Sequence, residues 1–212
     1  MFVLQGLRTR TRAGTTTLPW RPSAWPALRA LICLLPASGL AACGVLTPQE
    51  QVRHEYRISV SDGSALEHNQ FAGLVEDFNG SVGYSLLSYS RDRDNANSPV
   101  RLVKALEQST GKLGFGGVVV VTSRRGLATT RTESMRIELD RDYVLARVPS
   151  GPGETTYAEL RLLFFHEVGH GLGFGHGAAS SDVMYHDLLG EKDYDAFYAR
   201  VRDLIEFRAN QP

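Results

Sequence analysis

Strict alternation of hydrophobic and polar residues predicts two strands, each with one buried face. The stretches 56–61 (Tyr-Arg-Ile-Ser-Val-Ser) and 135–140 (Met-Arg-Ile-Glu-Leu-Asp) both show this pattern. A third strand is predicted over 84–89. The run of four valines at 118–121 is typical of a strand buried in the centre of a sheet.

Apolar residues at helical spacing predict three longer helices. The first opens with a capping box formed by Ser64 and Glu67. The second begins near Thr155, and its apolar side should pack on the sheet. The third covers 194–205 and closes the domain. A short helix is also predicted over 100–108, so the pattern as a whole indicates an α/β domain.

The string HEVGHGLGFGH, residues 166–176, carries the clearest chemistry of the chain. His166 and His170 are four residues apart, so a helix places them one turn apart on one face, where they can share a metal ion. Glu167 then lies beside the ion without being an obvious ligand. A base that takes a proton from water needs that position.

A third ligand requires the chain to turn back after the helix. Gly171 and Gly173 allow this, because glycine adopts positive φ angles without a steric clash. His176 then returns as the third ligand. Three neutral imidazoles leave a fourth position open for water, as catalytic zinc requires. The sequence therefore predicts one catalytic Zn²⁺.

The methionine at position 184 lies eight residues after His176, within the string Val-Met-Tyr. Together with H-E-x-x-H-x-x-G-x-x-H, it resembles the metzincin clan of zinc endopeptidases, and it is most similar to the matrixin family. The resemblance implies a twisted mixed sheet of four or five strands, about three helices, and zinc on the floor of a cleft. Met184 would pack beneath the metal without binding it. Glu167 would be the general base of peptide-bond hydrolysis, and an extended substrate would add to an edge strand.

Two positions depart from the matrixin pattern. Gly177 stands where typical matrixins have serine, and His186 stands two residues after the methionine. Tyr185 or His186 would be a transition-state (oxyanion) donor, or His186 an extra ligand. For His186, an ordinary loop histidine is the favoured interpretation.

The first 43 residues resemble a bacterial lipoprotein signal. They hold five arginines and no acidic residue, then an apolar run, and they end in Leu-Ala-Ala-Cys. Cys43 would be acylated, with 44–55 as a tether and 56–212 as the catalytic domain. Gly44 in place of aspartate favours the outer membrane of the cell envelope. The alternative is an ordinary secretory signal and a secreted protein.

Charge and cysteine content argue against some classes of binding partner and against disulfide bonds. Residues 44–212 hold 18 basic and 23 acidic residues, a net charge of −5, which gives no reason to expect nucleic-acid binding. The two cysteines, Cys33 and Cys43, both belong to the signal region, so we expect no disulfide in the mature chain and no cysteine latch on the zinc.

One further metal site and two functions other than proteolysis remain as alternatives. Side-chain oxygens in 91–97 offer a calcium site, but the spacing of known calcium loops is not met and turn chemistry is favoured. A lipid-anchored binding or assembly protein could keep the fold with little turnover, although such a protein gains nothing obvious from Glu167. A zinc hydrolase of cell-wall peptides is the third. The sequence leaves substrate and oligomeric state undetermined.

Overall fold

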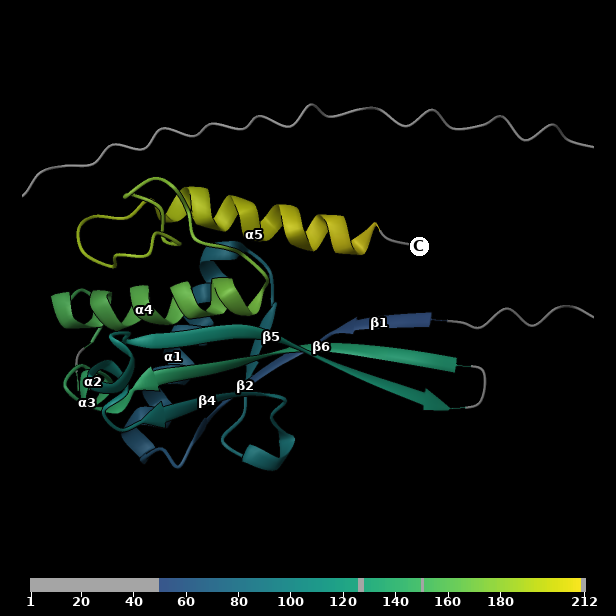
Figure 1. The fold of residues 1–212 in the computed structure, drawn as a ribbon, viewed down its shortest axis with the longest axis horizontal. Coiled ribbons are helices and arrows are strands. Elements are labelled where there is room, and N and C mark those ends of the chain that lie inside the picture. The colour runs from purple at the N-terminus through teal and green to yellow at the C-terminus, as the bar shows by residue number, and fades with distance from the viewer. Residues whose placement is uncertain (1–49, 126–127, 150, 211–212) are drawn as a thin grey trace, which may run out of the picture. The chain divides into compact units, whose positions relative to one another are not determined.

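The computed structural model describes residues 50–125, 128–149 and 151–210 (Figure 1). The predicted signal and Cys43 lie outside these residues. The described chain has six strands, five α-helices and one 3-10 helix. None of its helices is both long and apolar enough to cross a membrane.

Strands and helices alternate only in part along the chain. The strands are β1 (Glu50–His54), β2 (Tyr56–Ser61), β3 (Leu87–Tyr89), β4 (Ser98–Val103), β5 (Gly114–Arg125) and β6 (Ala128–Asp140). The helices are α1 (Ala65–Val82), the 3-10 helix η1 (Arg93–Asn95), α2 (Leu106–Thr110), α3 (Arg141–Leu145), α4 (Thr155–Gly171) and α5 (Tyr194–Ala209).

The sheet is mixed but mostly parallel. Its order is β5-β6-β4-β2-β3, and β1 lies beside the first half of β6. All pairings are parallel except the antiparallel hairpin of β5 and β6. The predicted α/β class with a mixed sheet is confirmed. The described residues form six strands rather than four or five, because β1 and β4 were not predicted.

The helix predicted over 100–108 is wrong. Ser98–Val103 is strand β4, which pairs with both β2 and β6, and only the five-residue helix α2 follows it. Val100 is fully buried between Val60 and Ile137 in these pairings. Tertiary pairing therefore overrides a local pattern that fits a helix as well as a strand.

The valine run is also not where its composition predicts. In the described sheet β5 pairs only with β6, so it is an edge strand. Its side chains from Val118 to Val121 are between 37% and 57% exposed. A continuous apolar run indicates apolar surroundings but does not say what supplies them. Strand β1 is a further difference, since it falls inside the predicted tether of 44–55.

The three longer helices form at the predicted places and cover one face of the sheet. Helix α1 has the capping box of Ser64 and Glu67, with both of its hydrogen bonds present. Phenylalanines from α1, α4 and α5 meet in the core: Phe78 lies edge-on to Phe165 with ring centroids 5.2 Å apart, and Phe165 stacks on Phe197. This cluster fixes α4, which carries the histidine string (Figure 1).

We expect Phe78→Ala to lower the free energy of unfolding by about 3–5 kcal/mol, because it leaves a cavity among three packed rings. Urea unfolding followed by circular dichroism measures this. The matched control is Leu66→Ala on the same helix, where the side chain is 51% exposed. That change should stay within about 0.5 kcal/mol of wild type. Equal effects at both positions would contradict the packing of the three rings.

Candidate metal centre

The last two turns of α4 place two histidines on the face opposite its packed side. Leu160, Phe164 and Val168 have no exposed surface. His166 is 5% exposed and His170 is half-buried. The 3.6-residue period separates these two sets, and both histidines line the cleft. Leu162, Leu163 and Phe165 are buried as well, so α4 packs on more sides than the one that was predicted.

The chain turns back directly after the helix. Gly173 has φ of 95°, and the Phe174 amide donates to the Gly169 carbonyl at 2.9 Å. This turn brings His176 to the other two histidines. The prediction was wrong for Gly171, which is the last residue of α4 and lacks a positive φ. A side chain there would instead meet Met135, with Cβ atoms 2.7 Å apart.

Two hydrogen bonds set the protonation of the imidazoles. Nδ1 of His166 lies 2.8 Å from the Val183 carbonyl oxygen, and Nδ1 of His170 lies 2.8 Å from that of Phe174. A carbonyl oxygen only accepts, so each Nδ1 carries the proton and donates it. In the neutral ring Nε2 is then a free lone pair, which is the form that binds a metal.

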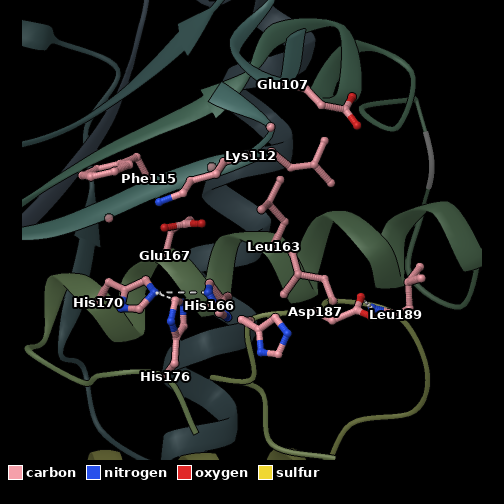
Figure 2. Close-up of a pocket in the computed structure, with 16 residues that line it drawn as sticks. Glu107, Lys112, Phe115, Leu163, His166, Glu167, His170, His176, Asp187 and Leu189 are labelled. Carbon is pink, nitrogen blue, oxygen red and sulfur yellow. Dashed lines mark hydrogen bonds between the residues drawn. The ribbon is translucent and has the colours of Figure 1, made fainter. Parts of the chain in front are cut away.

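The three Nε2 atoms converge on one point (Figure 2). Nε2 of His170 lies 3.1 Å from that of His166 and 3.2 Å from that of His176. Ligands about 2.0–2.1 Å from a tetrahedral zinc ion are about 3.3 Å apart, so the spacing fits such an ion. Lone pairs facing one another repel unless a cation lies between them. This group could therefore hold a metal ion.

Burial favours the neutral form of the His166 and His170 rings. Desolvation lowers the pKa of His166 to about 4, and it also lowers the pKa of His170. Imidazoles that resist protonation remain available as ligands below neutral pH.

Glu167 lies on the floor of the cleft, between α4 and β5. Its side chain is 4% exposed, and Oε2 has no hydrogen-bond partner. Burial raises the pKa of this carboxyl to about 8, and the charge of Lys112 opposes that shift. Figure 2 shows Lys112 extending across the cleft above it. An unpartnered buried carboxyl beside three metal-type nitrogens is the arrangement expected of a proton acceptor.

Strand β5 approaches α4 so closely that it needs glycine. A Cβ atom on Gly114 would lie 2.5 Å from Oε1 of Glu167, and one on Gly116 would overlap the main chain of Glu167. Neither residue can carry a side chain without moving the strand away. The sequence left open which strand borders the cleft, and the structure identifies β5.

Met184 is buried against Gly169, the residue before His170. It has no exposed surface, and its sulfur lies against Gly169, where a Cβ atom would overlap it. Phe197 also lies near Gly169, and Met184 does not belong to the converging ligand group. A place for Met184 beneath a bound metal stays a prediction.

Polar contacts hold the loop that contains Met184, and sequence reasoning did not find them. Asp182 accepts from the Met184 amide at 2.8 Å and pairs with Arg200 of α5 at 2.8 Å. The buried amine of Lys192 donates to the carbonyls of Ser180 and Asp187 at 2.8 and 2.7 Å. Nothing in their spacing distinguishes these residues from surface charges, so no sequence signal predicts the roles.

The departure at position 177 has a packing reason. A side chain on Gly177 would overlap the carboxylate of Asp182, and the Gly177 amide donates to the Met184 carbonyl at 2.8 Å. Glycine therefore lets the carboxylate sit against the segment that follows the third histidine.

Of the two residues after Met184, one lines the cleft and the other does not. His186 is exposed and lines the cleft, with its ring centroid 6.5 Å from that of His176, and it does not belong to the converging group. Tyr185 does not line the cleft; its ring lies 5.4 Å from the amine of Lys192. Of the two predicted oxyanion donors, the structure brings only His186 to the cleft.

The cleft has a volume of about 750 Å³. Its walls come from the segment before β5, from the first residues of β5, from α4, and from His176 and the residues after Met184. The apolar side chains on these walls are Leu113, Phe115, Leu163, Leu188 and Leu189. Charged groups at the mouth are Glu107, Lys112 and Asp187 (Figure 2). A mixed cleft of this size can accept side chains of a polypeptide.

The calcium alternative falls on the segment around η1. The Asp92 carboxylate accepts from the Asp94 amide at 3.0 Å and from the side-chain amide of Asn95 at 2.6 Å. These bonds cap a turn, as aspartate and asparagine commonly do.

Comparisons with known proteins add no relative. No protein-family model matches this chain, and no curated protein matches it.

We expect the protein to bind one Zn²⁺ per chain, and His176→Ala to weaken that affinity at least about 100-fold. Changes to outer-shell partners alone commonly cost about 10- to 100-fold, and this variant removes a ligand. Isothermal titration calorimetry on chelator-treated protein measures it. His186→Ala is the matched control and should bind zinc as wild type does. Equal losses in both variants would contradict the three-histidine site.

In the metal-free protein we expect Glu167→Gln to become more stabilising as pH rises from 5 to 8. The folded-state pKa of Glu167 is raised from 4.5 to about 8. The contribution of the protonated Glu167 carboxyl to the free energy of unfolding is therefore full below pH 4.5 and is lost as pH rises through about 8. Thermal unfolding of both proteins with chelator present, across this pH range, gives the difference. A difference independent of pH would show that the carboxyl is not desolvated.

Proposed function

We propose that this protein is a zinc-dependent metalloendopeptidase with a matrixin-like metzincin fold. One observation carries the proposal. Three histidine Nε2 atoms converge beside the buried, unpartnered carboxyl of Glu167, and an edge strand borders the same cleft. Each part has an ordinary structural explanation alone. Together they supply the metal ligands, the base and the substrate track that peptide hydrolysis needs.

The donor set supports zinc as the ion. His166, His170 and His176 offer three imidazole nitrogens that line the open cleft, which suits a catalytic rather than a structural zinc. When bound, zinc polarises a carbonyl group and lowers the pKa of a water molecule.

Residues of the chain transfer the proton and stabilise the oxyanion. The Glu167 carboxylate takes a proton from water and returns it to the leaving amine. Its burial between α4 and β5 excludes bulk water and holds the acceptor oxygen still. His186, at the cleft wall, is the candidate donor to the oxyanion.

Strand β5 is suited to bind the substrate main chain. Within the described sheet its second edge is unpaired, and Gly114 to Gly117 run directly past Glu167. An extended peptide can add to this edge by main-chain hydrogen bonds, with one side chain in the cleft. This mode suits unfolded or extended polypeptides.

We also propose that the mature protein is a lipoprotein of the cell envelope, anchored through Cys43 and favouring the outer membrane. Its support is the sequence Leu-Ala-Ala-Cys after an apolar run.

Casein cleavage by a chain of residues 44–212 tests the enzyme proposal. We expect cleavage that a chelator abolishes and zinc restores. Glu167→Gln should lower the rate by about 10²–10⁴-fold while zinc affinity is retained, because it removes the proton acceptor and keeps the shape. Gel electrophoresis follows the substrate, and calorimetry follows the metal.

The outcomes separate the alternative functions. A folded, zinc-bound protein that cleaves neither casein nor cell-wall peptides would support a binding or assembly role. Cleavage of wall peptides alone would make it a wall hydrolase. Full activity in Glu167→Gln would show that another group is the base and would overturn the mechanism.

A further inference from the structure

The β5–β6 hairpin continues well past the metal centre. Beyond Gly117, residues 118–125 of β5 pair with residues 128–135 of β6. All eight of these β5 residues are exposed. Figure 1 shows the hairpin extending beyond the end of α4, with β1 alongside it. Of these paired residues, only Met135 of β6, opposite Val118, belongs to the described hydrophobic core. The apolar composition of residues 118–121 therefore needs another explanation.

The extension is apolar on both faces. Consecutive strand residues point to opposite sides, so Val119 and Val121 lie on one face and Val118 and Val120 on the other. Their exposed fractions are 43% for Val118, 37% for Val119, 43% for Val120 and 57% for Val121. Four consecutive valines that point to alternate faces, each more than one-third exposed, are unusual for a strand in water.

Positive charge accompanies these valines. Residues 114–132 contain three arginines and no acidic residue, although residues 44–212 carry a net charge of −5. Arg124 and Arg125 are exposed at the far end of β5, immediately beyond the valines and two polar residues. An apolar segment next to exposed arginines complements a surface that is apolar inside and anionic outside.

The chain enters the described domain at this same end. Glu50, the first residue of β1, pairs with Thr129, which also pairs with Arg124. Cys43, the predicted lipid attachment site, is seven residues earlier in the sequence. A lipid on that cysteine would hold this end of the sheet near a membrane.

We propose that the outer part of the hairpin, Val118–Val121 with Arg124 and Arg125, binds the surface of a membrane that contains anionic phospholipid. A second protein would cover one face of the strand or its edge, whereas the head-group layer of a membrane can contact exposed valines on both faces. The unpaired edge of β5 limits the depth, because free main-chain groups are not tolerated in hydrocarbon. The valines therefore reach the interfacial layer, and the arginines meet lipid phosphates. This site is independent of the metal centre.

Vesicle co-sedimentation tests the proposal with a chain of residues 44–212, which has no attached lipid. Every member of the described hydrophobic core lies between Tyr56 and Val201, so this chain contains that core whole. We expect binding to vesicles of equal parts phosphatidylglycerol and phosphatidylcholine, and none to phosphatidylcholine alone. Raising the salt concentration should weaken it, because salt screens the arginines.

Two variants assign the binding to the hairpin. Arg124→Gln with Arg125→Gln should weaken it about 20-fold. Val119→Ser with Val121→Ser should weaken it at both low and high salt. The matched control is Arg91→Gln with Arg93→Gln, an exposed pair near η1, which should bind as wild type does. Cooperative thermal unfolding shows that each variant is folded.

Three results would overturn the proposal. The first is no binding to the anionic vesicles by folded protein. The second is equal loss in the hairpin and control arginine variants, which would indicate general charge attraction. The third is a dimer in analytical ultracentrifugation that the valine variant turns into monomer, which would assign the valines to a second copy of the chain.

Discussion

The candidate metal centre depends on two hydrogen bonds from imidazoles to main-chain carbonyls. Val183 and Phe174 supply those carbonyls, and both belong to segments that follow α4 rather than to the helix. Each bond fixes a ring's tautomer, its rotation and the direction of its Nε2 at once. The loop is held in turn by Asp182 and Lys192. The ligand geometry is thus a property of the loop as much as of the helix that carries the histidines.

The sequence predicts structure best where a short stretch of residues determines the local geometry by itself. The histidine spacing, the capping box at Ser64 and the turn after α4 all depend on local geometry, which a short stretch determines by itself. The predictions that were wrong concern elements whose structure depends on residues distant in the sequence. The stretch 100–108 becomes a strand because β2 and β6 lie on either side of it. The valines at 118–121 have the same composition whether protein, lipid or water surrounds them.

The site shows the same division. The three histidines and Glu167 follow from a motif, because the helix and the glycine turn place them. Glu167 being covered by β5 does not follow, since two glycines from another element allow the contact. Lys112 enters the cleft from the segment just before that strand. Such contacts are set by strand order, and strand order is what a single sequence specifies least.

The order of the strands also determines when the sheet can form. Strand β6 is the last in sequence, yet β1, β4 and β5 all pair with it. Glu50 pairs with Thr129, which lies 79 positions later in the sequence. Such distant pairs form slowly, because a long loop must close before its contacts compensate for the lost entropy. During synthesis β1 and β4 wait with unpaired edges until residue 140 is made. The chain then gains its sheet and, once α4 and the Met184 loop follow, its metal centre late and nearly together.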